Sequence, residues 1–376
     1  MSSPMDILTR ILRPAGGGIH VVSTGIDELR ALQAAIYGAK AGKGPEPGPA
    51  QAQWIDELWR KALAQISEAE VAILGVPSDI GAGFTRGANR APGAIRQYLL
   101  GRPEHPIWSD RVVDLGDVFT VPHFLSDEML SEPQLAAARE ALYGTDAMAE
   151  RLPVSPLDIC ESVLRIVYAI NPKIRPVVIG GDHSVAWPAF LAAHRHWEIE
   201  KGRRLGLLHF DAHTDLLSHR LGVRYCFATW AWHANELLQR DGRLVQVGIR
   251  ASGRDKAHWE QSMNVRQYWA QEANSRGVEE LIQEIGDHFE ELGVDALYVS
   301  NDIDGTDPQW AASTGTPEPD GLSPDLVSQL TLGLGQRFPL VAGDVVEVAP
   351  PLANDLPGHP DRTLHTAGRY ISDLII

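Results

Sequence analysis

The sequence predicts an α/β fold built on a mainly parallel sheet that is covered on both faces. From Val71 onward, short apolar runs rich in Val, Ile and Leu alternate with longer segments of helical pattern. Such runs favour parallel strands buried on both sides, because half-exposed strands alternate apolar and polar residues. With 376 residues and 44% hydrophobic content, the chain can bury a substantial core.

Six apolar runs mark the expected strands, and four of them lead into polar clusters. In order they are "VAILGV" (71–76), "PVVIGG" (176–181), "LGLLHF" (205–210), "RLVQVGI" (243–249), "ALYVSNDID" (296–304) and "LVAGDVVEV" (340–348). In open α/β sheets, functional groups collect where strands end at their carboxyl edge. The polar residues at these ends are therefore the candidates for a functional site.

The first seventy residues are interpreted as an N-terminal helical extension, and residues 71–376 as the catalytic domain. Helical patterns at about 26–37 and 52–66 flank "GAKAGKGPEPGPA" (38–50), whose Gly and Pro content is typical of a linker or exposed loop. Trp54 and Trp59 of this extension are open to two interpretations, an interface or packing within the chain.

Composition excludes several classes of partner. A net charge of −16 disfavours nucleic acid and anionic membrane surfaces, while a small cationic substrate would not be repelled. Cys160 and Cys226 are the only cysteines, so neither a disulfide framework nor a cysteine-based metal site is expected. Neither a signal-type apolar segment nor a membrane-length one is present, and a cytoplasmic protein is the expectation.

"LGLLHF" leads directly into Asp211, His213 and Asp215, three potential metal ligands within five residues. Residues two apart in an extended chain point to the same side. Asp211 and His213 can therefore contact the same ion, and so can Asp302 and Asp304. Burying several carboxylates together is prohibitive unless cations neutralise them. One divalent ion would leave this set overcharged, whereas two ions that share bridging carboxylates would fit it.

Each motif alone has a simpler interpretation. The Asp-x-His-x-Asp run is compatible with a capped loop, and "GGDHS" with a turn before an N-capping Ser184. Their occurrence together on three strand ends favours the metal site. Asp182 is interpreted as a turn residue or a support for the ligands, and Asp307 as a turn residue. His209 is left outside the site, as a core histidine or an outer contact.

The combination of "GGDHS", "FDAHTD", "SNDIDGTDP", "STGTPEPDGLS" and "GDVVEVAP" resembles the ureohydrolase family, which includes arginases, agmatinases and guanidinases. The resemblance extends from about Val71 to the C-terminus. It implies a three-layer α/β/α fold and a two-metal site that hydrolyses a guanidino C–N bond to release urea. It also implies homo-oligomers of three or six subunits, and a hetero-oligomer stays open.

The resemblance implies six metal ligands. They are His183 and Asp215 for one ion, His213 and Asp304 for the second, and the bridging Asp211 and Asp302. Glu347 falls where the family holds the guanidinium, and a strand-end salt bridge is its alternative. The expected catalytic residues are therefore Asp211, Asp302 and Glu347.

Two divalent ions match the chemistry of such a reaction. A guanidinium carbon is a poor electrophile because its charge is spread over three nitrogens, and neutral water is a poor nucleophile. Two ions roughly 3.5 to 4 Å apart can hold one water, lower its pKa and supply hydroxide. An oxygen-rich set with two imidazoles suits Mn²⁺, but imidazole suits Ni²⁺ as well, and the choice stays open.

The most informative departure from the family lies in "RYCFATWAWHANEL" (224–237). Agmatinase-like members usually carry a His-Gly-Thr stretch here, whose histidine is assigned to proton transfer or substrate contact. Phe227 stands in place of that histidine. His233, His219 or Asp302 acting as a proton shuttle are the possible substitutes, and the sequence does not rank them.

Four residues are expected to contact the substrate in addition to Glu347. They are Phe227, Thr229, Trp230 and Asn301. Aromatic faces can hold a small cation, although ordinary core packing is the alternative for such residues. A Gly-rich segment at 75–96 corresponds to the family's first active-site loop, where the backbone can approach a ligand closely.

The leading functional hypothesis is hydrolysis of guanidine or a small N-alkylguanidine or biguanide, which releases urea and ammonia or an amine. The altered histidine stretch and the long extension resemble the guanidine-hydrolase branch. Arginase activity is disfavoured because the sequence shows no evident residues that would bind the α-carboxylate and α-amine of arginine. Agmatinase or guanidinobutyrase is the alternative. A different class is a partner subunit of a hetero-oligomeric, metformin-type hydrolase with little activity alone.

Overall fold

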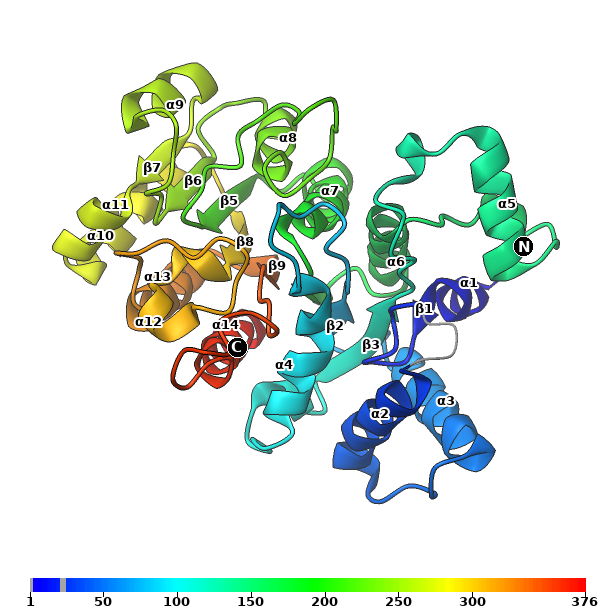
Figure 1. Cartoon of the computed structure of the whole chain (residues 1–376). Coiled ribbons are helices and arrows are strands. Elements are labelled where there is room, and N and C mark those ends of the chain that lie inside the picture. Colours follow the sequence, from blue (N-terminus) through cyan, green and yellow to red (C-terminus); the bar gives the residue numbers. More distant parts are fainter. Residues whose placement is uncertain (1–2, 21–24) are drawn as a thin grey trace.

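One mixed sheet runs through the computed structural model, which describes residues 3–20 and 25–376 (Figure 1). Every pair of neighbouring strands is parallel except β1 with β3. In sheet order the strands are β1 (Leu12–Arg13), β3 (Val112–Val118), β2 (Val71–Gly75), β4 (Arg175–Ile179), β9 (Leu340–Val346), β8 (Ala296–Asp302), β5 (Leu205–Phe210), β6 (Leu244–Val247) and β7 (Arg266–Tyr268).

The side chains of β5 show how the sheet separates two cores. Leu205 and Leu207 belong to a buried cluster on one face, whereas Leu208 and Phe210 belong to a second cluster on the other. Because successive residues of a strand point to opposite faces, an apolar run of this kind must be covered on both sides. The predicted α/β/α sandwich with a mainly parallel sheet is confirmed.

Helices form the two outer layers. The first core contains side chains of α1 (Pro4–Ile11), α3 (Pro49–Leu63), α6 (Pro156–Ile170), α7 (Ala186–His194) and α8 (Trp230–Leu237). The second contains side chains of α4 (Ala91–Leu99), α10 (Ala270–Ser275), α11 (Val278–Glu291), α12 (Pro308–Ala311), α13 (Pro324–Arg337) and α14 (Asp361–Ile375). The remaining α-helices of the described chain are α2 (Ile26–Ala41), α5 (Glu132–Tyr143) and α9 (Lys256–Met263).

All six expected strands are present, and the sequence missed three others, the short edge strands β1 and β7 and the seven-residue β3. This strand reads Val-Val-Asp-Leu-Gly-Asp-Val, so its acidic residues break the apolar pattern. The guanidinium of Arg96 on α4 explains them, because it is fully buried and donates to Asp114 at 2.8 Å and to Asp117 at 2.5 Å. A buried ion pair that is hydrogen-bonded on both sides lets charged residues occupy an interior strand.

The N-terminal extension joins the same sheet and core as the rest of the chain. Strand β1 pairs with β3, and Leu8 and Trp59 lie within the first core. The Gly/Pro-rich segment contributes residues to both neighbouring helices, and 42–48 connects α2 with α3. Figure 1 shows these two helices beside β3, at one end of the sheet. Residues 1–2 and 21–24 of the expected extension lie outside the described residues.

The order of the sheet brings the four polar strand ends together. Strands β4, β9, β8 and β5 are consecutive neighbours, although their sequence positions range from 175 to 346. Because they are parallel, their carboxyl ends share one edge, where ligands bind in folds of this kind. Among the described helices, none has the length and apolar character needed to cross a membrane.

We expect Trp59→Ala to detach part of the extension from the core. The Trp59 indole is 2% exposed, and its N–H donates to the carbonyl of Leu115 in β3 at 2.8 Å. Removing a buried tryptophan leaves a cavity and costs about 3–5 kcal/mol of the free energy of unfolding. Denaturant titration measures this loss. Trp54→Ala, at a half-buried position of the same helix, is the control, and equal losses would show that Trp59 does not anchor the extension.

Candidate metal centre

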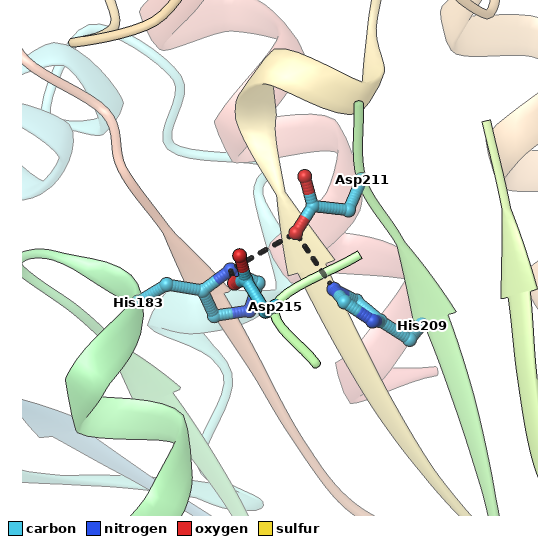
Figure 2. A group of neighbouring side chains, drawn as sticks. All are labelled: His183, His209, Asp211 and Asp215. Carbon is cyan, nitrogen blue, oxygen red and sulfur yellow. Dashed lines mark hydrogen bonds and ion pairs between the residues drawn. The ribbon is translucent and has the colours of Figure 1, made fainter. Parts of the chain in front are cut away.

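Asp211, directly after β5, lies between two histidines. Its Oδ2 is 3.3 Å from Nδ1 of His183, and its Oδ1 is 3.4 Å from Nδ1 of His213. Figure 2 shows the carboxylate above His183, with Asp215 beside it. Because each oxygen faces a different imidazole, this one buried carboxylate can bridge two cation positions.

Nδ1 of His183 has the surroundings of a ligand atom. Oxygens of Asp302, Asp215 and Asp211 lie 3.0, 3.1 and 3.3 Å from it. Yet Nδ1 forms no hydrogen bond with any described residue. A fully buried nitrogen that faces three carboxylate oxygens fits a divalent ion that accepts imidazole and oxygen ligands, as Mn²⁺ and Ni²⁺ do.

Nε2, the other ring nitrogen of His183, is hydrogen-bonded to Ser300 on the side of the ring away from the carboxylates. Oγ of Ser300 donates to Oδ1 of Asp344 at 2.7 Å and is therefore the acceptor for Nε2–H of His183 at 3.0 Å. Tyr298 donates to the second oxygen of Asp344 at 2.6 Å. This chain fixes the ring and directs Nδ1 toward the carboxylates. Asp344 therefore supports a ligand and does not itself face the cation position.

His213 and Asp304 form the second half of the centre, which is more open. Nδ1 of His213 is 3.2 Å from Oδ2 of Asp304, and the imidazole is 26% exposed. Thr316 donates to the same oxygen of Asp304 at 2.8 Å, and the backbone N–H of Ala212 donates to its Oδ1 at 3.2 Å. The sequence analysis did not identify Thr316, although it follows the "STG" part of a family motif.

Two aspartates in η7 (Ile303–Gly305) and the end of β8 connect both halves. Oδ2 of Asp302 faces His183, and its Oδ1 accepts the backbone N–H of Asp304 at 2.8 Å. Asp304 lies in the turn that follows β8, so this turn and not the alternation of an extended chain sets the position of its carboxylate relative to Asp302.

The charges of this cluster shift its pKa values strongly. Burial, followed by the charges of Asp304 and Asp211, raises the pKa of Asp302 well above its ordinary value. Burial lowers the pKa of His213, but Asp304 and Asp211 outweigh it and raise the pKa to about 12. Burial also opposes protonation of His183, yet its carboxylate partners hold the pKa well above the ordinary value. Protons here take the place of positive charge that cations can supply.

Glu347 is fixed by the backbone beside the cluster. Its Oε1 accepts the N–H of His183 at 2.8 Å, and its own N–H donates to Gly181 at 2.8 Å. The backbone has a φ of 60°, which is uncommon for a non-glycine residue and marks a constrained site. Gly315 lies beside this carboxylate, because a Cβ at that position would be 3.9 Å from Oε2 and 3.1 Å from the backbone oxygen of Thr85.

Two expected substrate contacts need correction. Thr229 is fully buried directly before α8, with its hydroxyl donating to the carbonyl of Arg224 at 2.8 Å. Trp230 is also fully buried, and its indole N–H donates to Asp215 at 3.0 Å. Neither side chain has an exposed surface for a substrate in this structure. Asn301 aligns with Phe210 of β5, on the sheet face opposite to Asp302, and its contact with a substrate stays a prediction.

Phe227 is the one half-buried member of that set. Its backbone N–H donates to the carbonyl of Gly81 at 3.1 Å, which ties it to the Gly-rich loop after β2. A side chain at Gly83 would lie 3.5 Å from the Phe227 ring. The loop itself is tied to the cluster, because the N–H of Gly81 donates to Asp182 at 3.0 Å.

The two histidines considered as substitutes for the family's histidine lie elsewhere. His233 is bonded to the carbonyl of Arg224 at 3.0 Å and packs against Trp187, Tyr225 and Trp232. His219 is exposed and contacts Ser218 at 3.0 Å. Of the three candidates, Asp302 is therefore the one that lies in the cluster.

Asp182 and Asp307, interpreted as structural residues, both accept hydrogen bonds from backbone N–H groups. Asp182 accepts the N–H of Ser184 at 2.8 Å and holds the Gly-rich loop. Asp307 accepts N–H groups of Gln309 and Gly321 at 3.0 and 3.1 Å. His209, left open between core and outer contact, donates to Asp211 at 2.8 Å and is an outer contact.

Comparison with known proteins gives consistent results. A model described as the arginase family matches residues 69–376. A guanidinobutyrase of Pseudomonas aeruginosa is 30% identical over 77% of this chain and 81% of its own length, and a human mitochondrial guanidino acid hydrolase is 31% identical over 77% and 74%. The solved proclavaminate amidino hydrolase of Streptomyces clavuligerus superposes with a TM-score of 0.63 at 28% identity, over 82% of this chain and 91% of that one.

We expect metal loading to release protons. The pKa of His213 is raised to about 12 and that of His183 well above its ordinary value, so both imidazoles hold a proton at pH 7 until a cation displaces it. Affinity for Mn²⁺ should therefore rise with pH, by about tenfold per unit for each proton released. Calorimetry in buffers of different ionisation enthalpy counts these protons, and a count of zero would contradict the assignment of both histidines.

Asp211→Ala and Glu347→Ala should separate metal binding from turnover. Asp211 faces both histidines, so its loss should abolish metal binding and activity together. Glu347 is not among the carboxylates that face Nδ1 of either histidine, so its loss should leave the metal content intact and reduce turnover by at least about 100-fold, the scale of a lost positioning group. Metal analysis beside urea release measures both effects. Normal metal content in the Asp211 variant would show that the ligand assignment is wrong.

Proposed function

Because the chain belongs to the arginase family of hydrolases that cleave guanidino C–N bonds, we propose that its substrate is guanidine or a small N-alkylguanidine or biguanide. The products would be urea and ammonia or an amine. The observation that carries this proposal is Phe227, an apolar ring at the position where agmatinase-like members have a histidine. It reduces the polar groups available to a long, functionalised substrate tail.

Six side chains would hold two divalent cations in this proposal. They are His183, Asp211, His213, Asp215, Asp302 and Asp304. A pair of divalent cations supplies Lewis acidity and makes water a stronger nucleophile near neutral pH. The donor set accepts either Mn²⁺ or Ni²⁺, and we propose one of these as the native metal.

Glu347 would orient the guanidino group. The backbone N–H of His183 donates to Oε1 at 2.8 Å and thereby fixes the carboxylate. A carboxylate fixed in this way can accept N–H groups of a planar cation and turn its central carbon toward the cluster. Burial and the charge of Asp182 raise the pKa of Glu347 well above its ordinary value, and a bound guanidinium would favour the ionised form.

Asp302 is the residue of this chain best placed to move a proton. Its Oδ2 lies 3.0 Å from Nδ1 of His183, and its Oδ1 accepts the backbone N–H of Asp304, so the carboxylate is held inside the cluster. A carboxylate in this place can accept a proton from the attacking water and deliver it to the leaving nitrogen. This role would compensate for the histidine that Phe227 replaces.

A second candidate, a guanidino acid such as 4-guanidinobutyrate, is favoured by Arg220. A cavity of about 560 Å³ is lined by Phe227, Phe84, Leu130 and Arg220, among others. The Arg220 guanidinium lies 5.3 Å from the centre of the Phe227 ring. None of the described residues lining the cavity carries a carboxylate, so the cavity offers a partner to a carboxylate tail and none to the amine tail of agmatine.

A substrate panel separates these candidates. We expect urea release to be fastest with guanidine, methylguanidines or metformin, slower with 4-guanidinobutyrate, and slowest with agmatine and arginine. The metal-loaded chain is incubated with each compound and urea is measured. Arg220→Ala should leave the small substrates unaffected and selectively raise KM for 4-guanidinobutyrate if that compound uses the cavity.

Agmatine turning over best would contradict the small-substrate proposal. A chain that binds two ions yet cleaves nothing until another protein is added would instead support a partner subunit in a hetero-oligomer. Homo-oligomers of three or six subunits stay a prediction, and the mass of the purified particle in solution tests them.

A further inference from the structure

The rings of His183, His209 and Trp230 pack against one another beside the carboxylate cluster. The rings of His209 and Trp230 are 5.1 and 4.6 Å from that of His183, and 4.9 Å from each other. All three side chains are fully buried. His183 lies in η5 (His183–Val185), His209 in β5 and Trp230 in α8, so three separate elements meet at this point.

His209 is held in a single tautomer by the neighbouring strand. The amide nitrogen of Gln246 on β6 donates to Nδ1 of His209 at 2.9 Å and to the carbonyl of Thr214 at 2.7 Å. The amide oxygen of Gln246 accepts from Gln267 at 2.8 Å, which confirms that its nitrogen faces the histidine. The proton of His209 must then be on Nε2, which donates to Oδ2 of Asp211 at 2.8 Å.

Trp230 makes the equivalent contact with Asp215. Its indole N–H donates to Oδ2 of Asp215 at 3.0 Å. The backbone of Asp215 has a φ of 51°, and its carbonyl accepts the N–H of Trp232 at 3.1 Å. An indole nitrogen can only donate, so this bond has one possible direction.

Both donors act on the oxygens that face the cation position. Oδ2 of Asp211 and Oδ2 of Asp215 are the atoms that lie 3.3 and 3.1 Å from Nδ1 of His183. A hydrogen bond to each oxygen fixes the rotation of its carboxylate before any ion arrives. An ion bound there would meet ligands that need little reorganisation.

We propose that His209 and Trp230 are positioning residues that set the affinity of the cation site at His183. The proposal rests on the two-metal site of the proposed function. The indole N–H of Trp230, and not only the bulk of its ring, holds Asp215 in place. No equivalent pair of rings supports His213 among the contacts of the described residues, so the effect should be confined to one of the two ions.

Trp230→Phe tests the indole N–H directly, because phenylalanine keeps a ring in the cluster and removes the donor. We expect one of the two ions to bind about 10- to 100-fold more weakly, and the other to bind within about threefold of the original affinity. Titration with Co²⁺, followed by visible absorption, reports both the affinity and the ligand geometry of each ion. The absorption of the weakened ion should change shape as well.

Trp232→Phe is the matched control. It makes the same chemical change two residues away, where the ring packs on His233 and the backbone bond to Asp215 is retained. We expect its Co²⁺ titration to equal that of the original chain. Melting temperatures of the metal-free variants separate a loss of packing from a loss of metal affinity.

His209 can be tested in the same way by two substitutions. His209→Leu removes the donor to Asp211 and should weaken the same ion as Trp230→Phe does. His209→Gln retains an N–H group that can reach Asp211 and should restore at least part of the affinity. This rescue would not follow if the residue only filled space.

The outcomes separate the inference from the function it rests on. If the original chain binds fewer than two ions, the two-metal site fails. If it binds two ions but Trp230→Phe and Trp232→Phe titrate alike, the positioning role is overturned. A lower melting temperature of metal-free Trp230→Phe with unchanged affinities would also overturn it, because the tryptophan would then serve packing alone.

Discussion

Carboxylates gathered in a dry part of a protein repel one another unless positive charge lies between them, and this constraint organises the whole chain. Asp211, Asp215, Asp302 and Asp304 are all at most 6% exposed. The sheet order places their strands side by side, and helices cover both faces so that water cannot screen the charges. The fold thus gathers negative charge that two divalent cations would neutralise, and such a pair of cations would supply the hydrolytic chemistry of the proposed function.

The six proposed metal ligands follow from the resemblance to a known family, and they stay a prediction. Most of the fold could be predicted from sequence because buried parallel strands leave a local pattern, a continuous apolar run. Strand β3 does not show this pattern. Its Asp114 and Asp117 form ion pairs with Arg96, a contact between two different elements that the local sequence does not reveal. Trp230 was misassigned for the same reason. Its sequence neighbours indicate an aromatic stretch, but only the approach of α8 to β5 shows that the indole serves Asp215.

In the proposed function, the residues that would set specificity are separate from the proposed metal ligands. Those ligands lie within a few residues of strand ends, whereas Phe227 and Arg220 lie further along the connection between β5 and α8. Loops of this kind change more readily than strand ends, because fewer buried contacts depend on them. A family can therefore keep one hydrolytic centre and direct it toward different guanidino compounds. In this chain an aromatic ring and a nearby guanidinium replace the polar surroundings that an imidazole would give.

The N-terminal extension has a further consequence for how copies of this chain can associate. The outermost strands of the sheet have only two residues in β1 and three in β7. Behind β1, the carbonyl of Leu115 in β3 is already occupied by the indole of Trp59. Because these edge strands are short or covered, a strand of another chain finds few free backbone groups to pair with, and this protects against aggregation by strand addition. Any assembly of this chain would then be joined through helices and loops, and its sheet would stay confined to a single subunit.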